Sequence, residues 1–241
     1  MLPLRTFLRI PRKPARLACC SVFALCAGTA TANDTSASSW KLSGFGTLGA
    51  VHANTDLADF SSSIVKASGA GASGRWSTDV DTRLGAQLDI AMARQWSAVL
   101  QVVSEQRYDN SYRPQVEWAN VKYQPVPDLT VRIGRMSLPV YMAAEHRKVG
   151  YVYSAVRQPL EVAGGMPITT SDGADLAWRW RTGDVRHITS VQYGYTSTAL
   201  SPNLRLRARD LASLAHSIDV GSFSARASIV SADVTIWALV W

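Results

Sequence analysis

The side chains that could carry chemistry in this chain of 241 residues form no recognisable catalytic motif. Gly44, Gly46 and Gly49 have the Gly-x-Gly-x-x-Gly spacing of a dinucleotide-binding loop. That loop needs a helix directly after it, because the helix N-terminus holds the pyrophosphate. Residues 50–54 instead continue a strand-like pattern into a polar loop. These glycines are therefore better interpreted as small residues in a strand.

Histidine and serine, which could also carry chemistry, form no recognisable site in the sequence either. The four histidines, His52, His146, His187 and His216, are scattered without the spacing of metal ligands. We expect each to be a surface or loop residue, or one that lines an internal channel. No serine lies in a Gly-x-Ser-x-Gly elbow, and no nucleophile has a base near it in the sequence. The sequence therefore predicts that the protein is not an enzyme and holds no metal or cofactor.

What remains is a set of polar side chains that recur at every second position. Within residues 83–90 these side chains fall on one face of a strand, and Leu84, Leu88 and Ile90 fall on the other. The alternation recurs in residues 96–105, 119–123, 129–133, 175–180 and 223–229. The residues expected on the polar faces or just beyond them are Arg83, Gln87, Asp89, Gln101, Glu105, Asn120, Lys122, Arg132, Arg135 and Arg179.

The elements that would position these residues are strands of about ten residues, the length that a tilted membrane strand requires. Helix signals are poor, although residues 210–216 could form a helical turn or a strand. The connections alternate between long ones, at 54–80, 107–114 and 136–173, and short ones, at 92–95, 125–128 and 182–184. Short periplasmic turns and long external loops are typical of outer-membrane barrels. We therefore expect an all-β, antiparallel transmembrane barrel with about ten candidate strands.

The competing fold is a soluble β-sandwich, whose strands also have one polar and one apolar face. Two features favour the barrel. Trp96, Tyr123, Trp180 and Tyr193 lie near strand ends, as in the aromatic girdles of membrane barrels. Charged residues also lie in the middle of the polar strand faces, which suits a water-filled lumen.

Residues 1–32 have the order of a secretory signal peptide: basic residues, an apolar run from Leu17 to Gly28, and small residues at Ala30 and Ala32. The apolar run is shorter than the ~20 residues of a spanning helix. A lipoprotein signal would need a small residue before an acylated cysteine, and Leu25 precedes Cys26. The sequence therefore predicts a cleaved signal peptide over 1–32 and one β-domain over 33–241.

Removal of this segment changes the charge and the cysteine content. It holds five of the 25 Lys and Arg residues and none of the 18 Asp and Glu residues, which leaves 20 basic and 18 acidic residues, a net charge of +2. The basicity that would suggest nucleic-acid binding is largely lost. All three cysteines also precede Ala32, so we expect no disulfide, thiol catalysis or zinc–cysteine site after cleavage.

Several segments, taken in order, resemble the Gram-negative porin-like family of bacterial outer membranes. They are residues 43–49, 81–88, 117–123, 131–135, 149–151 and 171–173, and the similarity covers most of 40–230. The resemblance implies passive diffusion of small hydrophilic solutes and ions through a barrel of about sixteen strands, often trimeric, in outer-membrane lipid. It also implies that the long segment after the fifth strand folds into the pore. The charges of that segment are Glu145, Arg147, Lys148, Arg157, Glu161 and Asp172.

The chain departs from this family in length, since 241 residues cannot supply about sixteen strands with their loops. We expect that the C-terminal half of a family member is missing or replaced. An open sheet of about ten strands would leave two unpaired edges in lipid. The chain must then close on itself, pair with another chain or fail to fold. Besides a porin, the sequence allows an exported soluble β-domain that binds a ligand or partner, or a non-functional truncated porin.

Overall fold

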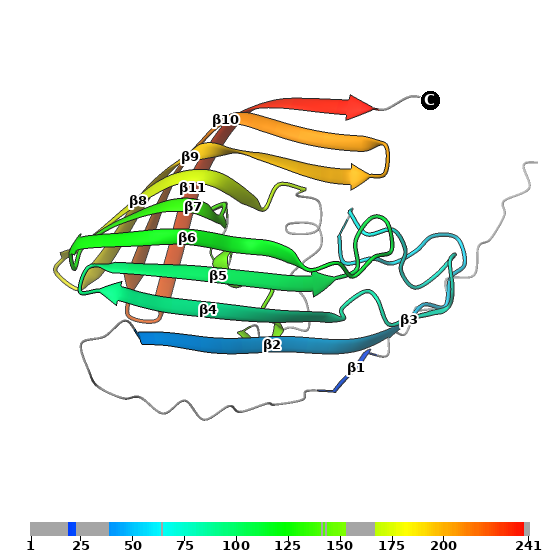
Figure 1. Ribbon diagram of the computed structural model, residues 1–241. Helices are drawn as coiled ribbons and strands as arrows, with labels where there is room; N and C mark the ends of the chain where they lie inside the picture. The colour runs from blue at the N-terminus through cyan, green and yellow to red at the C-terminus, as the bar shows by residue number, and fades with distance from the viewer. Residues whose placement is uncertain are drawn as a thin grey trace, which may run out of the picture.

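The computed structural model describes residues 19–22, 39–63, 65–140, 142, 144–152 and 167–238. Over these ranges the chain forms one antiparallel sheet of 11 strands (Figure 1). The strands are β1 (Cys19–Val22), β2 (Ser39–His52), β3 (Trp76–Ser77), β4 (Arg83–Ala93), β5 (Trp96–Glu105), β6 (Gln115–Val126), β7 (Leu129–Ser137), β8 (Thr170–Thr182), β9 (Val185–Ser201), β10 (Leu204–Val220) and β11 (Phe223–Ala238). The prediction of an all-β, antiparallel protein is therefore confirmed.

Helical structure is confined to two short 3-10 turns in the described residues, η1 (Ala144–His146) and η2 (Gly150–Val152). Both lie in the connection between β7 and β8. Within the described ranges, no helix has the length and apolar character needed to cross a membrane.

The sheet is a meander in which each long strand pairs with the next one along the chain, in the order β2-β4-β5-β6-β7-β8-β9-β10-β11. Side chains of the same kind face each other across β4 and β5: Leu88 lies opposite Leu100, and Gln87 lies opposite Gln101. Tight turns join β4 to β5, β6 to β7, β8 to β9 and β10 to β11 at one end of the sheet (Figure 1). The longer connections β2–β4, β5–β6 and β7–β8 lie at the other end, where residues 202–203 also join β9 to β10 in a tight turn. The predicted alternation in connection length therefore holds from β2 to β9 and ends at the β9–β10 turn.

Residues 210–216, which the sequence left open between helix and strand, lie inside β10. The ambiguity has a structural cause, because the register shifts between Arg209 and Ala212. Asp210 lies at this bulge with a positive φ of 48°. One extra residue in a strand interrupts the alternation of faces, so a simple period-two pattern fails there.

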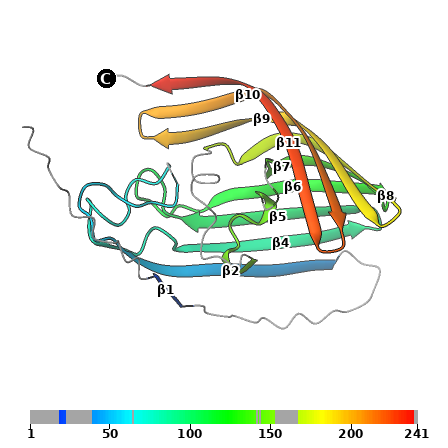
Figure 2. The ribbon, with the colours of Figure 1, turned by 180° about the vertical axis from the view of Figure 1, so that it is seen from behind.

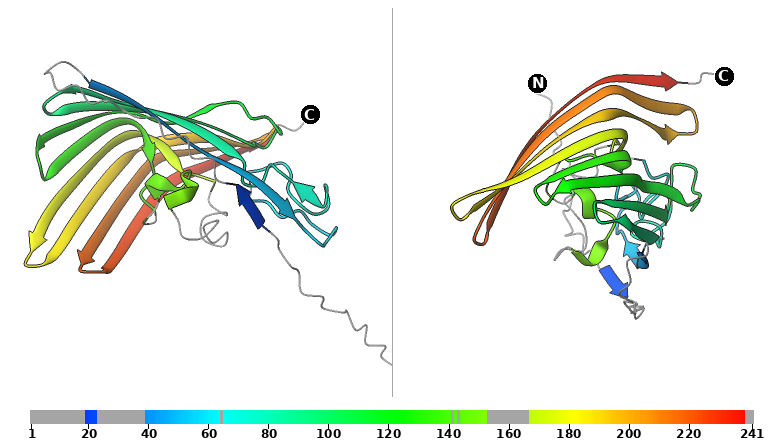
Figure 3. Two further views of the ribbon diagram at one scale, coloured as in Figure 1. Left: turned by 90° about the horizontal axis from the view of Figure 1, so that it is seen from below. Right: turned by 60° about the vertical axis from the view of Figure 1, so that its left-hand side comes forward.

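The described sheet is open, whereas the sequence predicted a closed barrel. No pairing joins β2 to β11 within the described residues, so β11 lies at one edge of the sheet. At the other edge, β1 pairs with Leu48–Val51 of β2 only, and β3 pairs with Val51 and His52. Figures 2 and 3 show β11 and β2 at opposite margins of the curved sheet. The strand β1 lies inside the segment predicted as a signal peptide.

The sheet curves around one side, and the start of the β7–β8 connection lies in its concavity (Figure 3, left). This connection packs through Leu138 against Leu206, Ala208 and Leu211 of β10. A second apolar cluster lies at the same end of the sheet, where Val51 of β2 meets Ala70 and Val80 of the β2–β4 connection. Both clusters attach long connections to the ends of strands.

Candidate functional site

From β4 to β9 the concave face is mostly polar and covered, and the convex face is mostly apolar and exposed. At the start of β10 the pattern reverses, because Arg205 is exposed on the convex side and Leu206 is buried on the concave side. Gln101 and Gln192 on the concave face are 4% and 1% exposed, whereas Leu84 and Ile133 on the convex face are 68% and 65% exposed. A soluble sheet has the opposite arrangement, because burial of apolar side chains drives its folding. The concave face, together with the connection packed on it, is the candidate site.

Most of the residues that the sequence analysis expected on polar strand faces lie on the concave face of the sheet. The strand registers and the face alternation bring nine of them to the concave face: Arg83, Gln87, Asp89, Gln101, Glu105, Asn120, Lys122, Arg132 and Arg179. Gln101 donates from Nε2 to Gln87 Oε1 at 2.7 Å, and Gln87 donates from Nε2 to Asp89 Oδ1 at 3.0 Å. Arg179 donates from Nη1 to Thr130 Oγ1 at 3.0 Å. Hydrogen bonds thus link polar side chains across neighbouring strands.

Arg132 of β7 joins the wall of the sheet to the β7–β8 connection. Its Nε lies 2.8 Å from Oδ1 of Asp175 on β8, and its Nη1 lies 3.0 Å from Oε1 of Glu145 in η1. The Asp175 side chain is 2% exposed and the Arg132 side chain 26%. A carboxylate this buried is stable in its charged form only beside a cation. Arg132 therefore neutralises Asp175 and holds the connection on the concave face.

Two basic residues of the β7–β8 connection, Arg147 and Lys148, form ion pairs with acidic residues of β5 and β6. Arg147 Nη2 lies 2.8 Å from Glu117 Oε2. Lys148 Nζ pairs with Glu105 and lies 3.7 Å from Glu117 Oε1. Burial lowers the pKa of Lys148, and the Glu105 carboxylate opposes this effect. Arg83 of β4 completes the contact by donating from Nη1 to the Arg147 carbonyl oxygen at 3.4 Å.

The β2–β4 connection also brings a charged side chain close to Glu105 and Arg83. Lys66, in the β2–β4 connection, donates from Nζ to the carbonyl oxygens of Asp79 and Val80 at 3.0 and 2.8 Å. Burial lowers the pKa of Lys66 to about 8, and Glu105 opposes this while Arg83 adds to it. Charges from the sheet and from two connections therefore form one network at the long-connection end of the concave face.

Two of the predicted site residues lie elsewhere. Arg135 lies on the convex side with Ile133, because both are at odd positions of β7, and it is not on the polar face with Arg132. Asp172 is opposite Arg135 inside β8, so it is a strand residue and not part of the β7–β8 connection. Their ion pair has an N–O distance of 2.7 Å, with side chains 41% and 27% exposed. The correction for Asp172 follows from the strand bounds, because β7 takes the first two residues of the predicted loop (136–137) and β8 takes its last four (170–173).

Glu145, Arg147 and Lys148 of the predicted constriction segment do meet the concave face, as described above. Arg157 and Glu161 of the same segment lie outside the described residues. The segment carries charges of both signs where it meets the sheet, and each is matched by an opposite charge on a strand.

Two important residues were absent from the predicted site. Asp175 could have been found, because it lies one position from Leu176 and so alternates onto the polar face. Glu117 could not, because simple alternation places it with Ala119 and Val121 on the apolar face. A register shift between Gln101 and Val102 changes the pairing at this point and lets the Glu117 carboxylate reach Arg147.

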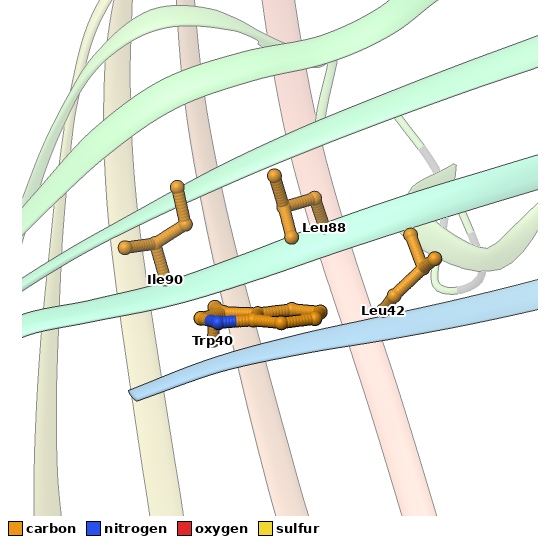
Figure 4. Close-up of a pocket in the computed structure, with 4 residues that line it drawn as sticks. All are labelled: Trp40, Leu42, Leu88 and Ile90. Carbon is orange, nitrogen blue, oxygen red and sulfur yellow. The ribbon is translucent and has the colours of Figure 1, made fainter. Parts of the chain in front are cut away.

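The convex face carries aromatic side chains near the tight turns. Trp96 and Tyr123, from β5 and β6, stack with ring centroids 4.5 Å apart. Near the edge formed by β2 there is an apolar hollow of about 450 Å³ lined by Trp40, Leu42, Leu88 and Ile90 (Figure 4). On the same face, Tyr193 and Tyr195 are exposed in the middle of β9, opposite Ala174 and Asp172 of β8. On the convex face of β8 and β9, aromatic residues therefore lie to both sides of Leu176 and Val191.

A comparison with protein-family models matched none of them, and no curated protein matched the chain significantly.

Proposed function

We propose that this chain forms the wall of an outer-membrane channel through which small hydrophilic solutes and ions diffuse passively. The observation that carries the proposal is the reversed placement of polar and apolar residues. Leu84 and Ile133 are exposed on the convex face, while Gln101 and Gln192 are buried on the concave face. Lipid would cover the exposed face at no cost in free energy, and water would hydrate the polar one.

The dimensions of the apolar band support this placement. On β8 the band runs from Trp180 near the tight turn to Asp172, opposite Tyr195. The eight steps from residue 172 to residue 180, at ~3.4 Å each, span ~27 Å, or ~20 Å across a bilayer at a tilt of about 40°. This is close to the ~25 Å apolar band of outer-membrane barrels, with aromatic girdles at both ends.

The ion pairs of the β7–β8 connection suit a segment that narrows such a channel. Glu145 forms an ion pair with β7, Arg147 with β6 and Lys148 with β5. These pairs keep the segment against the wall. Fixed charges of both signs beside a water-filled path favour ions and polar solutes over apolar ones.

A channel in lipid also requires that both edges of the sheet be paired, since an unpaired backbone group in hydrocarbon costs several kcal/mol. The proposal therefore includes closure of the sheet through β2 and β11, either with each other or with strands of another chain. A closed barrel resists detergent until it is heated. We expect the protein to fractionate with the outer membrane and to change its electrophoretic mobility on boiling.

Conductance in planar bilayers tests the channel itself. We expect ohmic channels, and we expect Lys122→Glu to shift the reversal potential in a salt gradient towards cation preference, because Lys122 lies on the concave face. Arg205→Glu is the matched control, since Arg205 is exposed on the convex side of β10. A well-folded protein without channels, or one found in the periplasmic fraction without detergent, would contradict the proposal and favour a soluble exported domain.

A further inference from the structure

Two of the four histidines, which are far apart in the sequence, meet on the convex face near the β8–β9 and β10–β11 turns. Nδ1 of His187 in β9 lies 3.4 Å from Nε2 of His216 in β10. They occupy diagonal positions of the ladder, because His216 pairs with Thr189 and His187 pairs with Ile218. Both imidazoles are partly exposed. The meander thus produces a cross-strand histidine pair that spacing in the sequence did not suggest.

The surroundings of the pair fix the orientation of both rings. Thr189 Oγ1 lies 2.8 Å from Nδ1 of His216. When His216 donates its Nδ1–H to this hydroxyl, its Nε2 keeps a free lone pair directed towards His187. The Trp180 ring stacks on His187 with centroids 5.0 Å apart and an angle of 9° between the planes. Trp180 also packs against His216 at 5.6 Å. The two facing nitrogens are therefore held in place by neighbours that do not compete for them.

We propose that His187 and His216 bind a zinc ion through Nδ1 and Nε2, respectively. Two imidazole nitrogens on tetrahedral zinc, at bonds of ~2.0–2.1 Å, lie ~3.4 Å apart, which matches the observed separation. Square-planar copper would draw adjacent ligands to within ~2.8 Å at the same bond length. His187 then carries its proton on Nε2, and coordination of zinc by Nδ1 and Nε2 replaces the hydrogen bond between the two facing nitrogens.

The remaining coordination positions are open. The described residues contain no group of three or more His, Cys, Asp or Glu side chains that could hold a metal. Water therefore completes the tetrahedron. The Thr189 hydroxyl acts behind His216 by accepting a hydrogen bond from Nδ1–H in the zinc-binding tautomer, which orients the ring, and such outer partners typically change metal affinity ~10–100-fold. The inference rests on residues of β8, β9 and β10 and does not depend on the proposed channel.

Isothermal titration calorimetry of the full chain with zinc chloride tests the proposal, with folded protein in detergent that was purified without a polyhistidine tag. We expect one saturable site. His187→Ala and His216→Ala should each weaken binding at least tenfold. His52→Ala and His146→Ala are the matched controls. They keep His187, His216 and all three cysteines of the full chain, so they should leave the zinc affinity unchanged. Far-UV circular dichroism of each variant checks that the sheet is intact.

Two further measurements separate coordination from a general loss of structure. Thr189→Val keeps both histidines and should still weaken binding about tenfold, because the hydrogen bond that orients the His216 ring is lost. Cobalt(II) in place of zinc should give the intense visible absorption of tetrahedral coordination, and His216→Ala should abolish it. Equal zinc binding by the wild type and His216→Ala, or no saturable binding by the folded wild type, would show that the pair is only hydrogen-bonded and would overturn the proposal.

Discussion

Arg132 contacts two carboxylates at once, and one of them, Asp175, is buried. Removal of its side chain would leave Asp175 charged and without its cation at 2% exposure. Loss of one partner of a buried ion pair is strongly destabilising, whereas loss of an exposed pair costs little. The two ion pairs of β7 provide this comparison within one strand.

We predict that Arg132→Ala lowers the free energy of unfolding by about 3 kcal/mol. Arg135→Ala, which breaks the exposed pair with Asp172, should lower it by less than about 1 kcal/mol. Urea unfolding in detergent, followed by tryptophan fluorescence, measures both. Addition of Asp175→Asn to Arg132→Ala should restore part of the loss, because a neutral amide needs no cation. Equal costs for the two arginine variants would contradict the burial argument.

The lowered pKa of Lys66 predicts how the stability of the protein depends on pH. Its pKa is lowered from the ordinary value of 10.5 to about 8, chiefly by burial. The unfolded chain therefore binds more protons than the folded one between pH 8 and 10.5, and stability rises with pH in that window. Below pH 8 the charged ammonium is held in both states and this contribution is constant.

We predict that the stability difference between the wild type and Lys66→Met shifts in favour of the wild type as the pH rises from 8 to 10.5. Chemical denaturation at several pH values measures the difference. Arg75→Met, in the same connection, serves as the control because arginine stays charged throughout this range. A difference that is flat in pH would mean that Lys66 is not held in a desolvated position.

At the scale of the elements, the alternation of polar and apolar residues found β4 to β8 and β11, but it gave no strand over 185–201, where β9 lies, and it left 210–216 of β10 open. It placed β4, β5 and β7 with starting residues that match the structure, and it found the tight turns between them. It failed where a strand adds a residue, as at Asp210 and near Glu117. The partners of the charges could not be read from the sequence either. They depend on how the β7–β8 connection folds back, which no local pattern encodes.

Gly134 shows how closely the middle strands approach. It has a φ of +128°, and an added Cβ would lie 2.2 Å from the Ala119 carbonyl oxygen. Gly183, in the β8–β9 turn, has a φ of +59° with open space around it. We predict that Gly183→Ala costs about 1 kcal/mol, from the left-handed backbone alone. Gly134→Ala should cost clearly more, because β6 and β7 must also separate. Thermal unfolding of the two variants makes the comparison, and equal costs would contradict the close approach.

At the scale of the whole molecule, the central question is what covers the convex face. Leu176 lies in the middle of this face, between Val131 and Val191, and Val220 lies beside the β10–β11 turn. In a membrane, arginine costs ~2–4 kcal/mol at the midplane and ~0–1 kcal/mol near the interface. In water, arginine at either exposed position costs little.

We therefore predict that Leu176→Arg impairs folding into lipid vesicles by ~2–4 kcal/mol and that Val220→Arg does so by less than ~1 kcal/mol. Folding yields and urea unfolding in vesicles give both values. Similar small effects from both variants would indicate that the convex face meets water, which would remove the basis for the channel.

The meander has a consequence for how such a protein can change over evolutionary time. Because every long strand of the described sheet pairs only with its neighbours along the chain, a hairpin is a self-contained unit of growth. Duplication or deletion of one hairpin alters the circumference of the sheet and leaves the ladders on either side intact. A single genetic event could therefore produce wider or narrower descendants, with selection acting afterwards on the connection that fills the concave side.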